Sequence, residues 1–189
     1  MHTISRYIVT SLCCYSTIDI AHQDWCIYAL EKKLYKIVSF FLALFSGLLL
    51  HAPIESALIF ISTNFLRTRI SGWHAQSPFL CIALTISTCC FGGILAKWLA
   101  SVVPIAALFL FLLNVCLCLL FKPIANANLH LTNAEIYQNK KLGLYRTCFM
   151  MLISLLLFLF TQLTSLSISL QSGILVALMS TFIKEQEKS

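Results

Sequence analysis

The sequence predicts an all-α fold, namely a polytopic membrane helical bundle preceded by amphipathic helices that lie in the membrane interface. Composition is the first observation: of 189 residues, 59% are hydrophobic and only 11% are charged, and the mean hydropathy is +0.88. Soluble domains carry roughly 25% charged residues, so this chain has too little polar surface to face water on all sides. Apolar runs also alternate with short polar segments, and the basic residues gather in those segments.

About six apolar runs are candidate membrane helices, although some are shorter than the ~20 residues that a full crossing needs. They cover approximately residues 35–50, 53–66, 79–96, 98–121, 148–164 and 167–183. The 53–66 run is the weakest, and we expect it to be tilted or re-entrant. Pro53 suits the first turn of a helix, whereas Pro104 is expected to bend the fourth helix.

Residues 1–34 form an N-terminal arm with apolar residues at helical spacing. The first stripe contains Ile4, Tyr7, Ile8, Leu12, Tyr15 and Ile18, and the second begins at Ile27 and Leu30. Such stripes beside basic residues are typical of helices in the headgroup plane, and packing on the other helices is the alternative. We expect the arm to belong to a single integral-membrane domain, residues 1–189.

The basic residues predict the orientation in the membrane. With six crossings, only Lys97 of the 13 Lys and Arg residues falls on the side opposite to the others. Because positive charge is retained in the cytoplasm, both termini are expected to be cytoplasmic in a multi-pass protein of the bacterial cell membrane. Four crossings and two re-entrant elements would give the same sidedness.

Residues 122–147 are expected to be a basic cytoplasmic loop. Four basic residues, Lys122, Lys140, Lys141 and Arg146, stand against Glu135 alone, for a net charge of +3. One interpretation is a dock for an acidic peptide segment, to which Lys140 and Lys141 would contribute substrate-binding residues. The other is the ordinary excess of positive charge in cytoplasmic loops.

A histidine and a cysteine seven residues apart mark the boundary between the second and third apolar runs. His74 belongs to a polar segment, residues 67–78, which we expect to be a catalytic loop. On one continuous helix this spacing separates two residues by ~10 Å along the axis, too far for a hydrogen bond. Gly72 loosens the segment, and Ser77-Pro78 has the pattern of an N-cap followed by proline at the first helical position. His74 can therefore fold back toward Cys81.

The start of a helix suits nucleophilic catalysis by a thiol. Unpaired N–H groups and the helix dipole favour an anion there, and hence a thiolate. We expect Cys81 to be the nucleophile and His74 to act as its base and later as an acid. Arg67 and Arg69 add positive potential and are expected to contact the substrate. A chance pairing of one His with one Cys is the alternative.

Other classes of site have little support. The nine cysteines show neither a C-x-x-C pair nor the Cys/His spacing of a zinc site, so no metal and no cofactor are expected. The basic clusters lie at helix ends without an aromatic platform, which argues against nucleic acid as a partner. Glu55, near the end of a run, is the only acidic residue inside a predicted membrane helix, which argues against a transport path.

The segment from Arg67 to Cys81 resembles the signature of the accessory gene regulator protein B (AgrB) family of membrane cysteine endopeptidases. The resemblance extends over most of the chain, through the charged arm and the order of apolar runs. It rests on Gly72-Trp73-His74-Ala75 with Cys81 following, Phe121-Lys122-Pro123, Lys140-Lys141 and Phe182-Ile183-Lys184-Glu185. By motif position, the catalytic residues of the family correspond to His74 and Cys81.

The resemblance implies an activity in bacterial quorum sensing. The family removes the C-terminal tail of a precursor peptide, AgrD, and an acyl-enzyme then yields a cyclic thiolactone. The implied partners are an AgrD-like precursor and the lipid bilayer, and a homodimer is compatible with the resemblance. Processing of a different precursor to a lactone or a linear peptide is an alternative, as is a non-catalytic transporter or scaffold.

Overall fold

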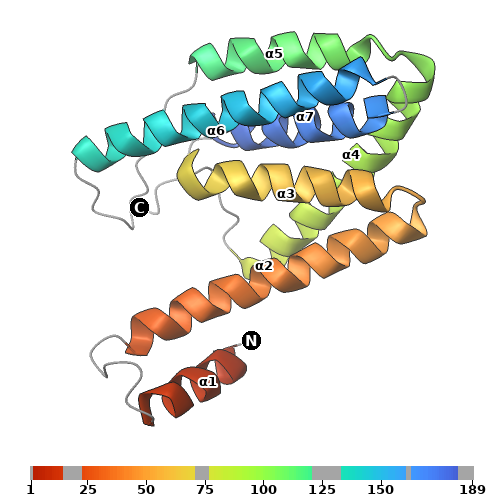
Figure 1. The fold of residues 1–189 in the computed structure, drawn as a ribbon. Helices are drawn as coiled ribbons and strands as arrows, with labels where there is room; N and C mark the ends of the chain where they lie inside the picture. The colour runs from red at the N-terminus through yellow and green to blue at the C-terminus, as the bar shows by residue number, and fades with distance from the viewer. Residues whose placement is uncertain (1, 15–22, 71–76, 121–132, 161–162, 183–189) are drawn as a thin grey trace. The chain divides into compact units, whose positions relative to one another are not determined.

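The computed structural model describes residues 2–14, 23–70, 77–120, 133–160 and 163–182, and in these residues it contains helices and no strands (Figure 1). The helices are α1 His2–Cys14, α2 Gln23–Leu49, α3 Pro53–Ile70, α4 Pro78–Val102, α5 Ala106–Leu120, α6 Asn133–Leu159 and α7 Thr164–Met179. The prediction of an all-α fold is confirmed. The chain forms two compact units, Met1–Leu42 and Ala43–Ser189, and α2 continues from one into the other.

Three helix boundaries differ from those expected. α2 begins at Gln23, so the second part of the arm and the first apolar run form one helix, because lysine residues are good helix formers and do not interrupt it. α4 extends to Val102, and Pro104 follows the helix instead of bending it, because proline lacks the N–H that would continue the hydrogen-bond ladder. α6 begins at Asn133, so residues 133–147 are helical where a loop was expected.

The first unit contains α1 and most of α2. Ser5 and Val9 of α1 and Ile27 of α2 are buried. The Gln23 side chain donates a hydrogen bond from Nε2 to Thr10 Oγ1 at 3.3 Å, which links the two helices. The helices thus bury small apolar stripes while Tyr7 and Trp25 remain exposed, as expected for amphipathic helices.

In the second unit, α7 is the central helix. It packs against α3, α4, α5 and α6, and Figure 1 shows α3, α5 and α6 running alongside it. Its sequence is unusually polar for a buried helix. The buried residues of α7 are Thr164, Ser167, Ile168, Ser169, Leu170, Gln171, Gly173, Ile174, Ala177 and Leu178.

Buried polar side chains connect α7 to its neighbours. Asn114 on α5 donates from Nδ2 to the Gln171 carbonyl oxygen at 3.1 Å, and Gln171 Nε2 donates to Ser154 Oγ on α6 at 2.7 Å. The hydroxyl oxygens of Ser154 and Ser167 lie 3.0 Å apart. Where the surroundings are apolar, helices associate through small residues and interhelical hydrogen bonds of this kind.

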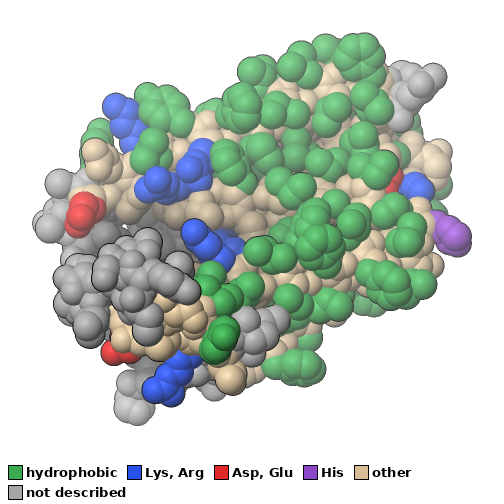
Figure 2. Space-filling model, turned by 60° about the horizontal axis from the view of Figure 1, so that its bottom comes forward, with side chains coloured by type: hydrophobic (Ala, Val, Ile, Leu, Met, Phe, Trp, Pro, Cys, Tyr) green, Lys and Arg blue, Asp and Glu red, His purple; other side chains and the backbone are tan. Residues whose placement is uncertain are grey.

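The outer surfaces of these helices are apolar, as Figure 2 shows for one face of the molecule. Large side chains such as Phe91, Phe109, Leu119 and Leu156 are exposed. Within the described residues, Phe79–Val102 and Tyr137–Leu159 are long and apolar enough to cross a membrane, whereas α5 and α7 are shorter apolar helices. A polar interior with an apolar exterior indicates association with a membrane.

α3 and α7 approach each other closely at Gly173. A Cβ atom at this position would overlap Ser62 Oγ and would lie 2.9 Å from the Ile59 carbonyl oxygen. Thr63 Oγ1 donates to the Gly173 carbonyl oxygen at 3.1 Å, so both backbones contribute to the contact. Only glycine allows the two helices to lie this close together.

Replacing Gly173 with alanine is expected to lower the free energy of unfolding by ~1–3 kcal/mol, the usual range for overpacking. The measurement is thermal unfolding of the purified protein in detergent. Gly92→Ala is the matched control, because its added Cβ would meet only the Ile59 Cδ1 atom, the far end of a flexible side chain. Equal unfolding temperatures for the two variants would contradict the tight α3–α7 contact.

Candidate active site

Cys81 lies in the first turn of α4, which begins as the sequence predicts. Ser77 is the N-cap in an extended conformation (φ −116°, ψ 143°), and its hydroxyl oxygen accepts a hydrogen bond from the Leu80 N–H at 3.1 Å. Pro78 follows at the start of the helix. The Cys81 N–H donates to the Ser77 carbonyl oxygen at 3.1 Å, and the Cys81 side chain is half-buried. The cap thus fixes the backbone that carries the thiol.

Arg67, in the last turn of α3, interacts electrostatically with Cys81. Burial lowers the pKa of the Arg67 guanidinium, and the negative potential of the Cys81 sulfur acts in the opposite direction. Arginine nevertheless remains cationic in proteins. A half-buried cation therefore lies within electrostatic range of Cys81.

The carboxyl end of α3 is held by α6. Arg146 donates from Nη1 to the Phe65 carbonyl oxygen at 3.0 Å and to Thr68 Oγ1 at 2.7 Å, and its guanidinium stacks on the Phe65 ring, 4.6 Å from the centroid. Arg69 donates from Nη1 to Asn139 Oδ1 at 3.4 Å. Cations are favourable at a helix C-terminus, where carbonyl groups are left without helical partners. The first half of α6 therefore packs beside the residues that flank Arg67.

The two lysines expected to bind substrate lie on α6 and not in a loop. Lys140 is half-buried, whereas Lys141 is exposed with its Nζ 6.0 Å from the centroid of the Tyr145 ring. Both follow Asn139, which contacts Arg69. Lys140 and Lys141 are thus within one helical turn of the residue that joins α6 to the end of α3.

His74 lies outside the described residues, as do Lys122 and the rest of the segment 121–132. Of the two predicted catalytic residues, the structure therefore describes Cys81 alone. Ile70, the last residue of α3, and Ser77, which precedes α4, are the described residues on either side of the segment 71–76.

Sequence reasoning missed the contribution of Asn139 and gave Arg146 only a general basic role. A signal was available, because Thr132 and Glu135 have the spacing of a capping box at a helix start. A helix from this point places Asn139 and Arg146, seven residues apart, on one face. That face is the one that contacts α3.

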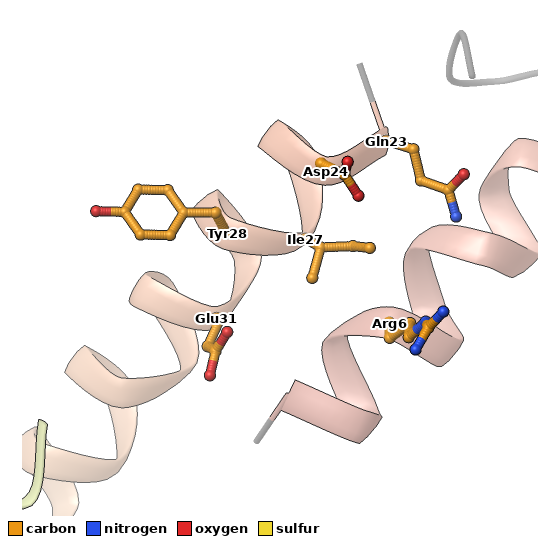
Figure 3. Close-up of a pocket in the computed structure, with 6 residues that line it drawn as sticks. All are labelled: Arg6, Gln23, Asp24, Ile27, Tyr28 and Glu31. Atoms are coloured by element: carbon orange, nitrogen blue, oxygen red, sulfur yellow. The ribbon is translucent and has the colours of Figure 1, made fainter. Parts of the chain in front are cut away.

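A separate pocket of about 590 Å³ lies between α1 and α2 in the first unit (Figure 3). Arg6 of α1 faces acidic residues of α2 across it, and none of the predicted site residues lines it. Its lining residues are Arg6, Gln23, Asp24, Ile27, Tyr28 and Glu31. Among the described residues, no group of three or more His, Cys, Asp or Glu side chains is placed to hold a metal ion.

The comparisons with known proteins identify the family. The family model described as accessory gene regulator B matches residues 2–183. No curated protein and no solved structure matches the chain. The match covers nearly the whole chain and includes α4 with Cys81 and the segment that contains His74. The chain therefore belongs to the accessory gene regulator B family, whose role lies in the maturation of the accessory gene regulator peptide.

Proposed function

We propose that this protein is a membrane-embedded cysteine endopeptidase that removes the C-terminal tail of an AgrD-like precursor and, through an acyl-enzyme, forms a cyclic thiolactone peptide. The observation that carries the proposal is the position of Cys81. It lies on a capped helix start, within electrostatic range of the half-buried cation of Arg67, and follows His74 closely in the chain. Membership of the accessory gene regulator B family supports the same reading.

The chain between His74 and Ser77 is short enough to allow His74 to act on the thiol. His74 precedes Ser77 by three residues, so at most about 11 Å of chain separates their Cα atoms. The Ser77 carbonyl oxygen in turn accepts the Cys81 N–H. An imidazole on so short a tether can reach the Cys81 sulfur, take its proton as a base and hold it as imidazolium.

The chemistry then follows in two steps. The Cys81 thiolate attacks the carbonyl carbon of the scissile peptide bond, the C–N bond breaks, and His74 donates its proton to the departing amine of the tail. The precursor body remains bound to Cys81 as a thioester. An internal cysteine of the precursor gives its thiol proton to His74 and attacks this thioester, which closes the ring and releases the Cys81 thiolate. The second step competes with hydrolysis because the attacking thiol is held close to the ester.

Basic residues near the site favour an acidic substrate segment. Lys140 and Lys141 are carried by the same helix as Asn139 and Arg146, which contact the end of α3. Arg69 is exposed beside them. Together these cations provide a positive surface on which an acidic tail would be attracted and oriented before cleavage. With both termini cytoplasmic in a multi-pass arrangement, this surface faces the compartment in which a precursor is made.

The peptidase assignment predicts that Cys81→Ala and His74→Ala abolish tail release. Cys81→Ser is also expected to fail, because an alcohol is a far weaker nucleophile than a thiolate at neutral pH. The chain is co-expressed with its precursor, and the released tail is followed by mass spectrometry. Cys116→Ala, which removes an exposed thiol from α5, is the matched control and should process normally. Unchanged processing in Cys81→Ala or His74→Ala would rule out the assignment.

The same measurement identifies the product. A thiolactone has the mass of the cleaved peptide less one water and opens with hydroxylamine. A linear peptide retains the water. Detection of a linear product would support cleavage by the protein but contradict the cyclisation step.

The docking surface predicts a salt-dependent defect. Replacing Lys140 and Lys141 together with glutamate is expected to raise the KM for an acidic precursor, with a larger effect at low salt. The Debye length falls from about 10 Å at 0.1 M to about 3 Å at 1 M salt, so screening weakens the repulsion at the higher concentration. Replacing both with arginine keeps the charge and should leave KM nearly unchanged. An equal loss at both salt concentrations would contradict an electrostatic dock.

A further inference from the structure

α6 has two sides with different surroundings. One side is buried in the second unit, and it also contacts α3 through Asn139 and Arg146. Among the residues of α6 that the structure describes, the buried ones are Gly143, Thr147, Met150, Met151 and Ser154. Side chains on the opposite side of the helix therefore face the surroundings of the protein.

This opposite side of α6 carries a continuous row of exposed side chains. They follow one another at spacings of three or four residues, which places them on one face of the helix. This face, the outer stripe, consists of Tyr137, Lys141, Tyr145, Cys148, Leu152 and Leu156, all of which are exposed. Even the two leucines are 56% and 51% exposed, so the stripe has a large surface to offer to a partner.

The outer stripe changes in character along its length. It begins with two tyrosines and a lysine and continues with Cys148 and the leucines. The Lys141 Nζ atom lies 6.0 Å from the centroid of the Tyr145 ring, one helical turn further along. Tyrosine and lysine are typical of the boundary between lipid headgroups and hydrocarbon. From Lys141 to the end of α6 at Leu159 the helix is ~27 Å long, close to the ~30 Å of a hydrocarbon core.

Lys141 does not share a face with the residues of α6 that contact α3. With 3.6 residues per turn, it lies ~160° around the helix from Asn139 and ~140° from Arg146. Lys140 lies between the two sides and is half-buried, whereas Lys141 is exposed over the Tyr145 ring. The two neighbouring lysines therefore meet different surroundings, and the ammonium of Lys141 belongs to the outer stripe.

We propose that the outer stripe binds an anionic phospholipid, with Lys141 on the lipid phosphate. The ammonium supplies the opposite charge, and the phenol groups of Tyr137 and Tyr145, one turn before and one turn after it, supply further hydrogen-bond donors. The apolar half of the stripe continues directly from this site and contacts the acyl chains. An acidic peptide would use the first half of the stripe alone, whereas a phospholipid matches both halves.

The side chains of the outer stripe favour lipid over a second copy of the chain. Helices that pair within a membrane pack through small residues, whereas this stripe carries tyrosines and leucines. A symmetric pair of parallel stripes would also bring two Lys141 side chains together, and like charges oppose such a contact. Lipid binding by this face does not require the peptidase activity proposed above.

The test uses photo-crosslinking from Cys148, which is exposed two turns beyond Lys141 and leaves the lysine and both tyrosines intact. Cys148 is replaced by benzoylphenylalanine in the full-length protein, which is placed in vesicles of equimolar phosphatidylglycerol and phosphatidylcholine with identical acyl chains. Mass spectrometry identifies the lipid on the crosslinked peptide. Phosphatidylglycerol is expected ~5-fold more often, the factor for one lysine near an anionic surface.

Variants of the two lysines separate a site from general surface charge. Lys141→Gln should remove most of the preference, and Lys141→Arg should keep it because the charge remains. Lys140→Gln is the matched control: it removes the same charge one residue away, and the preference should be nearly unchanged. Benzoylphenylalanine in place of Phe109, an exposed residue of the uncharged helix α5, should crosslink both lipids equally.

Salt tests the same contact without a variant of the lysine. At 1 M salt the Debye length is about 3 Å, and the preference at position 148 should fall toward one. A preference that is absent at low salt, persists at 1 M, survives Lys141→Gln or falls equally in Lys140→Gln would overturn the proposal. Crosslinks from position 148 to a second copy of the chain in place of lipid would overturn it as well, because protein would then cover the stripe.

Discussion

The close contact between α3 and α7 at Gly173 determines how the second unit is built. α7 carries several buried polar residues, and hydrogen bonds join it to α3, α5 and α6. The absence of a side chain at Gly173 allows α3 to lie directly against it. α3 therefore has a fixed position along α7, and its carboxyl end meets both α4 and α6.

Much of the fold follows from hydropathy, and the errors occur where hydropathy does not change at a helix boundary or changes within a helix. The apolar runs locate α3, α4, α5, α6 and α7, because each presents a broad apolar surface. Hydropathy does not identify the first half of α6 as a helix, because this half carries charged residues and packs through Asn139 and Arg146. The break between α4 and α5 is also invisible to hydropathy, because apolar residues continue through it and only Pro104 marks it.

Part of the candidate site could be predicted from the sequence, and part could not. The cap at Ser77 could be predicted because an N-cap followed by proline is a matter of local chemistry, complete within four residues. The electrostatic interaction between Arg67 and Cys81 could not, because the two residues lie on different helices and the packing of α3 on α4 sets their separation. Arg69 was predicted to bind substrate, and in the structure it donates a hydrogen bond to Asn139. The two residues are 70 positions apart in the chain, so no local sequence pattern could predict this contact.

The central place of α7 has a consequence for biosynthesis. Synthesis runs from the N-terminus, so Thr63, Asn114 and Ser154 are made before the α7 groups to which they hydrogen-bond. Each of these hydrogen bonds has to wait for the synthesis of Thr164–Met179. A nascent chain interrupted ahead of Thr164 would thus lack the polar contacts that join α3, α5 and α6 to one another through α7.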